Sequence, residues 1–310
     1  MSSLNSATPE SAASAVIFMY HRVATLQPDC HELCTPPDGF RDQLTRLARS
    51  HRVLPLDELC ARAQTGEPLG GAVAITLDDG TLDSFAAAEI LGELGLPATF
   101  FVTTERLDEP HESWWDVLER LFVADGPLPP RLTVEGLSLP TATVDERLRA
   151  HQQLRARVLA QSAEERDACI DAVVRWSGRA LAPRDSHRLL VADEVAELAR
   201  RPGCTVGAHS VHHLVLSTCS LPSQRAEIVG SRDALLAVLG AAPASFAYPF
   251  GALDDTTVEL VAAAGFSCAV TTQARLLAPH EPRLRLPRVA APLLYGEAFS
   301  AFLARQFAER

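Results

Sequence analysis

Two adjacent carboxylates follow an apolar run in the segment AVAITLDDG, residues 72–80. The run is rich in β-branched residues and is typical of a buried strand, and Asp78 and Asp79 come directly after it. Two negative charges side by side at the end of a buried strand are costly in free energy unless a positive charge lies close to them. The pair therefore predicts a cation site at this strand end, although Asp-Asp-Gly also forms ordinary turns and helix caps.

A second polar cluster, HSVHH at residues 209–213, follows the strand-like run TVGAH. His209 and His213 are four residues apart, so a helical or turn-like backbone puts both imidazoles on one side. Two histidines with one carboxylate leave an open coordination position, as in catalytic sites for zinc and its first-row neighbours. A divalent metal is thus the predicted cation, bound by one aspartate while the other stays free to accept protons. The spacing alone does not exclude His212, and such histidines also occur on ordinary helix surfaces.

Short apolar runs that predict strands recur along the chain. They cover residues 15–20, 52–56, 72–77, 98–104, 205–209, 244–249, 268–272 and 285–290. Helical patterns lie between them, over residues 40–50, 84–95, 224–240 and 256–266. Strands that alternate with helices predict an α/β fold with a parallel sheet, and eight candidate strands favour a barrel over an open sheet. Both polar clusters end strands, where parallel α/β folds carry their active sites.

Residues from 105 to about 190 interrupt this alternation. The proline-rich segment 127–140 predicts a small hairpin or an extended loop. Two capping-box patterns follow, Thr143 with Glu146 and Ser162 with Glu165, and each opens a helix rich in Arg, Glu and Ala. We therefore expect a single domain over residues 15–310 with a helical insertion, preceded by a disordered tail at 1–14.

The composition excludes several classes of partner. The 310 residues carry a net charge of -11 without any basic run, which argues against nucleic acid and anionic membrane surfaces. Seven cysteines without a C-x-x-C pair indicate a reduced, cytoplasmic protein. The apolar segment near the N-terminus is too short for a signal peptide or a membrane span, so we predict neither.

Three ordered motifs carry a resemblance to a known family. TLDDG, GAHSVHHLVLS and FAYPFG are similar to the first three motifs of the polysaccharide deacetylase (NodB-homology) family of carbohydrate esterases. MYHRV, SRDALLAVLG and AAAGFSCAVTT resemble one branch of that family. The likeness covers most of residues 15–105 and 190–290 but not the insertion. It implies a deformed (β/α) barrel.

This resemblance implies that the protein removes an acyl group from an N-acylated sugar. The attacking water would be activated by a divalent metal, and zinc is the predicted metal. The residues assigned by the resemblance are the metal ligands Asp79, His209 and His213, the general base Asp78, and, at the substrate or oxyanion site, Tyr248 and the backbone N–H of Phe250.

The chain departs from the family pattern at two positions. Many members carry an arginine two residues before the proline of the third motif, where this chain has Ala247. Arg288, in the run RLPRVA, is a candidate replacement from another strand, although such arginines more often form surface ion pairs. The family's C-terminal histidine has no counterpart except His280, in a loop-like stretch. His21, at the end of AVIFMY, is the candidate acid, as in the branch resembled here, and the alternative is a packed histidine.

Trp114 and Trp115 open the insertion, and adjacent tryptophans point in different directions. One of them could contact the sugar, although packing in the core is the more common role of a tryptophan. The alternatives to sugar deacetylation are a deformylase, an O-acyl esterase, a hydrolase of another amide, and a non-catalytic carbohydrate-binding relative. The retained Asp78 argues against the last of these. Because no export signal is predicted, we expect a small or precursor glycan, or a glycosylated metabolite, rather than a cell-wall polymer.

Overall fold

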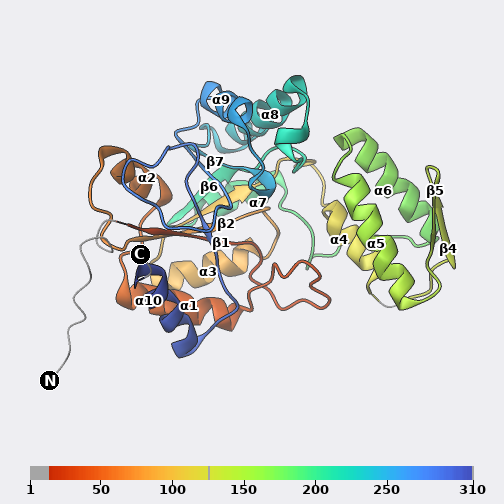
Figure 1. The fold of residues 1–310 in the computed structure, drawn as a ribbon, viewed down its shortest axis with the longest axis horizontal. Helices are drawn as coiled ribbons and strands as arrows, with labels where there is room; N and C mark the ends of the chain where they lie inside the picture. Colours follow the sequence, from red (N-terminus) through yellow and green to blue (C-terminus); the bar gives the residue numbers. More distant parts are fainter. Residues whose placement is uncertain (1–13, 125, 309–310) are drawn as a thin grey trace.

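The computed structural model describes residues 14–124 and 126–308. At its centre is a curled seven-stranded sheet in the order β8-β7-β6-β3-β2-β1-β9, in which all neighbouring strands are parallel (Figure 1). Its strands are β1 (Val16–Tyr20), β2 (Val73–Leu77), β3 (Ala98–Val102), β6 (Cys204–Ala208), β7 (Ser245–Ala247), β8 (Cys268–Val270) and β9 (Val289–Ala290). The predicted parallel sheet and deformed barrel are confirmed.

A single short segment joins the two edges of this sheet. Leu286 forms a parallel bridge to Val270 in β8, and three residues later Val289 pairs with Phe18 in β1. The segment 286–290 therefore closes the curled sheet with two short contacts instead of one long strand. Arg288 lies between these two contacts and is fully buried.

The predicted strand at 52–56 is wrong. Only Val53 makes an isolated bridge, to Val73, and α2 (Leu56–Thr65) begins two residues after Leu54. Pro55 explains the difference, because a proline has no N–H for a sheet ladder and its fixed φ suits the start of a helix. Pro55 is the N-cap residue of α2.

Alternating residues of the strands build two layers of core. Ile17, Ala74 and Phe101 lie inside the curled sheet, where α2 also packs. Their neighbours Phe18 and Phe100 face the outer helices. Those helices are α1 (Pro37–Ser50), α3 (Ser84–Leu94), α7 (Ala192–Arg200), α8 (Leu221–Leu239), α9 (Asp255–Ala263) and α10 (Gly296–Ala308). The four predicted helices are all present. In the described ranges, no helix is both long enough and apolar enough to cross a membrane.

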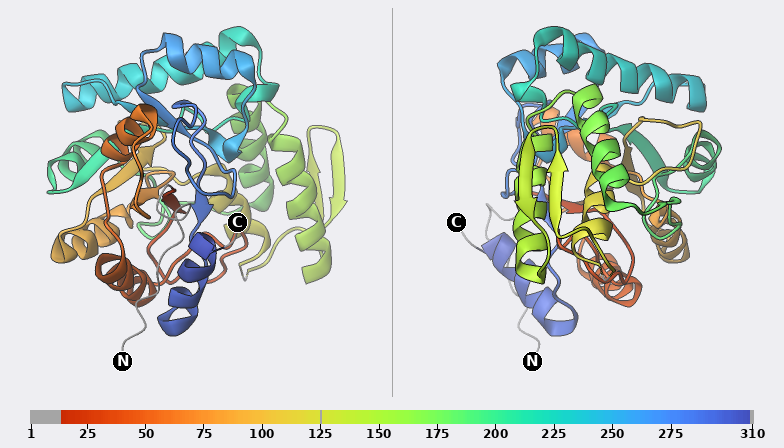
Figure 2. Two further views of the ribbon diagram at one scale, coloured as in Figure 1. Left: turned by 60° about the vertical axis from the view of Figure 1, so that its left-hand side comes forward. Right: turned by 90° about the vertical axis from the view of Figure 1, so that its right-hand side faces the viewer.

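The segment between β3 and α7 forms a lobe beside the barrel (Figures 1 and 2). It contains α4 (Trp114–Phe122), a hairpin of β4 (Arg131–Val134) and β5 (Leu137–Pro140), α5 (Val144–Val158) and α6 (Ala163–Ser177). These elements share a hydrophobic cluster that includes Leu118, Leu154 and Val173. Both predicted capping boxes form, at Thr143 and Ser162, so each helix satisfies its first free N–H groups with its own side chains.

Candidate active site

The polar residues that follow the strands meet around one cavity of about 210 Å³ at the carboxyl edge of the sheet. Strands β1, β2, β6 and β7 all end here, because the carboxyl ends of parallel strands share one edge of a sheet. The predicted site residues that line the cavity are His21, Asp78, Asp79, Trp114, Trp115, His209, His213, Tyr248 and Phe250.

Three of these side chains form a cluster that fits a metal ion. The Nε2 atoms of His209 and His213 each lie 3.5 Å from Oδ1 of Asp79, and the three donor atoms lie within 4.8 Å of one another. The Nδ1 of His209 is 2.8 Å from the carbonyl oxygen of Ala247 and donates its proton there. Burial disfavours a charged His209, but the bond to Asp79 and the charges of Asp78 and Asp79 outweigh it and raise the pKa of His209. Its Nε2 therefore lies where a positive charge is favoured, and a metal ion would supply that charge. The donor set of two imidazoles and one carboxylate suits zinc and similar metals.

Unusual backbone conformations aim these ligands at one point. Asp79, Ser210 and His213 have positive φ values of 75°, 62° and 53°, which non-glycine residues rarely adopt. The hydroxyl of Ser210 accepts the backbone N–H of His213 at 3.0 Å and holds the turn between the two histidines. Such strain persists where the surroundings enforce it, and it concentrates at functional sites.

The third histidine of the cluster is held away from the other two. Nδ1 of His212 lies 2.6 Å from Oε1 of Glu227 in α8, whose other oxygen accepts the backbone N–H groups of Val211 and His212. Arg166, from α6, donates to the carbonyl of His212 at 2.6 Å. The fold therefore selects the pair His209 and His213, which the spacing alone could not do. The bond from Arg166 to His212 also joins the lobe to the loop that carries His209 and His213.

Asp78 is held by a buried arginine. Nη1 and Nη2 of Arg288 donate to the two carboxylate oxygens of Asp78, each at 2.7 Å. Arg288 also donates through Nε to the carbonyl of Thr271 and through Nη1 to the hydroxyl of Thr76. Burial disfavours the charged carboxylate, but Arg288 outweighs this, and the pKa of Asp78 lies below its ordinary value. Asp78 is therefore ionised at neutral pH.

His21 follows β1 and lines the cavity. Its neighbour Arg22 is buried and fixes the backbone here, with contacts of 3.2 Å to both Asp83 and Asp116. His280, the other histidine weighed for the acid, lies against the C-terminal end of α2 at Gly66 and does not line this cavity. The geometry thus brings His21, and not His280, to the carboxylates.

The third motif places Phe250 at the cavity, while the hydroxyl of its tyrosine, Tyr248, is bonded elsewhere. Phe250 has a φ of 57°, and its ring packs edge-on against His213 with 4.6 Å between centroids. Within the described chain no acceptor is present for the Phe250 N–H. Tyr248 is fully buried and donates its hydroxyl to the carbonyl of Leu284 at 3.0 Å. The Tyr248 hydroxyl is therefore committed to the core, and contact of this side chain with substrate stays a prediction.

The lobe adds three side chains to the cavity wall, and a loop of the barrel adds His31. Trp115 lies against His213, with 5.0 Å between ring centroids, and Trp114 packs edge-on against Trp115 while belonging to the lobe's core. His31, from the loop between β1 and α1, and Arg155, from α5, also line the cavity. Sequence reasoning missed His31 and Arg155, because no motif marks them and only the packing of the lobe on the barrel brings them here.

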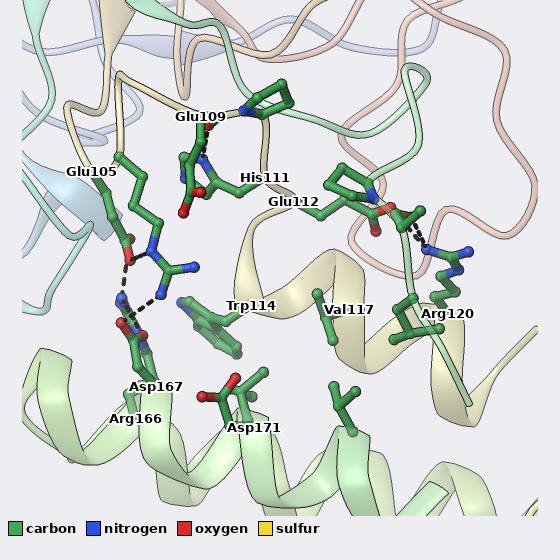
Figure 3. Close-up of a pocket in the computed structure, with 17 residues that line it drawn as sticks. Glu105, Glu109, His111, Glu112, Trp114, Val117, Arg120, Arg166, Asp167 and Asp171 are labelled. Carbon is green, nitrogen blue, oxygen red and sulfur yellow. Dashed lines mark hydrogen bonds and ion pairs between the residues drawn. The ribbon is translucent and has the colours of Figure 1, made fainter. Parts of the chain in front are cut away.

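A second cavity, of about 280 Å³, lies between α6 and the segment that follows β3 (Figure 3). Several of its charged side chains pair with one another, whereas Glu109 and Asp171 form no ion pair in the described part of the chain. Arg166 contacts Glu105 at 3.1 Å, and Arg106 contacts Asp167 at 3.2 Å. Trp114 separates this cavity from the first, since it lines both. The paired charges give this second cavity a structural role in joining the lobe to the barrel.

Comparisons with known proteins agree with this arrangement. A family model described as polysaccharide deacetylase matches residues 158–269, which include His209, His213 and Phe250 but not Asp78 and Asp79. A search of curated proteins gives no match. The fold resembles the Streptococcus pyogenes deacetylase PplD, solved with acetate, with a TM-score of 0.62 and 19% identity over 95% of this chain and 99% of that one.

Two further solved structures share the fold. IcaB from Ammonifex degensii has a TM-score of 0.59 and 18% identity, over 94% of this chain and 96% of its own. A polysaccharide deacetylase from Bacillus cereus has a TM-score of 0.58 and 16% identity, over 95% of this chain and 69% of its own. At these identities the likeness concerns the fold.

Proposed function

We propose that the chain is a member of the polysaccharide deacetylase family, whose model matches residues 158–269, and that it removes an N-acetyl group from a small or precursor glycan with the help of a divalent metal, zinc by preference. One observation carries the proposal. A cluster of two imidazoles and one carboxylate that suits a metal lies beside Asp78, an ionised carboxylate held by Arg288.

Asp79, His209 and His213 are the residues that would hold the metal. A bound divalent metal supplies a Lewis acid that polarises the amide carbonyl and lowers the pKa of the attacking water. The orientation of these ligands is set by the protein itself, through the bond from His209 to Ala247 and the turn closed by Ser210.

Asp78 acts as the general base. Arg288 keeps it ionised and fixes its orientation, and each carboxylate oxygen retains a second lone pair for the proton of the attacking water. The free N–H of Phe250 lies at the same cavity and donates to the oxygen that becomes negative as water adds to the carbonyl. Its positive φ presents this N–H without the competing bonds of a regular helix.

His21 serves as the general acid that protonates the leaving amine. It lies on the wall of the same cavity as Asp78 but on another strand, so acid and base can act on different atoms of one bound amide. Trp115 offers an aromatic face beside His213 on which a sugar ring can pack. The cavity of about 210 Å³ is small for a ligand pocket and favours one sugar unit at a time.

Acetate release tests the proposal. We expect the zinc-loaded protein to release acetate from N-acetylglucosamine derivatives, and Asp78→Asn to lose about 100-fold or more of this activity while it retains zinc. Asp57→Asn, an exposed position on α2, is the matched control and should keep wild-type activity. Activity above a tenth of wild type in Asp78→Asn would contradict the assignment of the base, and activity confined to long polymers such as chitin would contradict the size of the substrate.

A further inference from the structure

One cation on the wall of the active-site cavity has no partner. Arg155, on α5, lines the cavity, and its Nε is buried without a hydrogen-bond acceptor. Among residues 14–124 and 126–308 no carboxylate forms an ion pair with its guanidinium. Arg157, two residues further on the same helix, also has an Nε without an acceptor but differs in its ion pair, since its Nη2 contacts Glu135 at 3.4 Å. A guanidinium that lines a cavity without a counter-ion is suited to bind an anion there.

Two histidines with unpartnered nitrogens surround Arg155. His151 lies one helical turn before it on α5 and is buried, and its Nε2 has no hydrogen-bond partner. His31, from the loop between β1 and α1, lines the cavity, and its buried Nε2 also lacks a partner. The rings of His31 and His151 lie 6.2 Å apart. Three polar nitrogens without a hydrogen-bond partner therefore lie close together, and two of them, on Arg155 and His31, belong to side chains that line the cavity.

The nearby carboxylates are already engaged. Glu119 accepts the backbone N–H of Cys30 at 2.8 Å, and Asp29 accepts those of Leu33 and Cys34, each at 3.0 Å. Burial and the charge of Arg155 lower the pKa of His31. Burial, His31 and Arg155 lower the pKa of His151 to about 4. Both imidazoles are thus neutral near pH 7, and Arg155 is the cation of the group.

We propose that Arg155, together with His31 and His151, forms a subsite for an oxyanion on the acylated sugar, a phosphate ester. The inference rests on the proposed function, because the anion is placed on the molecule whose amide is cleaved at the other end of the cavity. Arg155 supplies a planar fork of N–H donors that matches phosphate oxygens, and a neutral imidazole adds one N–H donor. An anomeric phosphate is how nucleotide and lipid carriers hold a sugar, and a 6-phosphate is the other common source of the same chemistry.

Binding to metal-stripped protein tests the subsite without turnover. Calorimetry at pH 7.5 would compare N-acetylglucosamine 1-phosphate, N-acetylglucosamine 6-phosphate and neutral N-acetylglucosamine. We expect at least one phosphate to bind tenfold or more tightly than the neutral sugar, with the preferred isomer showing which source fits. Arg155→Gln should lose this preference, and Arg157→Gln, the matched control, should retain it. Circular dichroism would confirm folding, and Arg155→Met or His31→Asn replaces any variant that fails to fold.

The outcomes separate this inference from the proposed function. Equal binding of charged and neutral sugars by the wild type, or an unchanged preference in folded Arg155→Gln, would overturn the subsite. Acetate release from the neutral sugar with no phosphate preference would leave the proposed function standing and the subsite refuted. A phosphate preference that depends on Arg155, without acetate release from any probe, would support the subsite and refute the proposed function.

Discussion

Replacing Arg288 by methionine removes the partner that holds Asp78 while filling much of the same volume. In the folded protein Arg288 is completely buried. Its Nη1 and Nη2 donate to Asp78, Nη1 also donates to Thr76, and Nε donates to Thr271. Asp78 is itself only 3% exposed, so water replaces the lost donors only in part. Removing one partner of such a buried pair typically costs about 3–5 kcal/mol of unfolding free energy, because the other charge is left uncompensated.

The same reasoning predicts a partial rescue. In Arg288→Met combined with Asp78→Asn no unpaired charge remains, so we expect the double variant to be more stable than Arg288→Met alone. Urea denaturation of metal-stripped protein, followed by circular dichroism, measures both values. Arg285→Met is the matched control on the same segment, because Arg285 is 42% exposed and pairs with the exposed Asp255. It should cost less than about 1 kcal/mol.

Two results would refute this reasoning. If Arg288→Met were no less stable than Arg285→Met, the buried contact would carry no stability. If the two substitutions simply added, Asp78 and Arg288 would not be coupled, and another group would be keeping Asp78 ionised.

Two further predictions concern His21 and His187. His21→Ala should retain zinc and lose about 10²–10⁴-fold in acetate release, so full activity on an amide substrate would remove His21 from the mechanism. Burial and nearby Arg184 and Arg22 lower the pKa of His187 to about 4. An unfolded histidine titrates near 6.5, so between about pH 6.5 and 4 the unfolded chain binds a proton that folded His187 does not. The unfolding free energy should therefore fall as the pH is lowered through this range, by up to about 3 kcal/mol from this group, and His187→Asn should show a shallower fall by urea titration.

Local patterns predicted the regular parts of the fold. The apolar runs that became β1, β2 and β3 are buried on both faces, so composition alone identifies them. β6 is buried only over its last three residues. The two capping boxes marked the starts of α5 and α6 because their bonds join residues three apart. The predicted strand at 52–56 was wrong because the prediction followed the apolar pattern and gave too little weight to Pro55. In the structure Pro55 is the N-cap of α2.

The parts of the site that depend on contacts between distant segments could not be predicted from the sequence. Asp78 and Arg288 are 210 residues apart, and no local pattern shows that the segment closing the barrel places a guanidinium on that carboxylate. The spacing of the three histidines could not show that His212 is outside the candidate metal cluster, because the contact that holds it away is with Glu227 in α8. Arg155 lies in a lobe outside the resembling motifs and reaches the cavity through the packing of α5 on the barrel.

Titration of zinc into metal-stripped protein by calorimetry tests the central claim most directly, because it needs no knowledge of the substrate. The account predicts one tight site in the wild type, its loss or severe weakening in Asp79→Asn and His213→Ala, and wild-type binding in His212→Asn, whose ring faces Glu227. Zinc binding that is unchanged in Asp79→Asn and His213→Ala, or absent from the wild type, would contradict it.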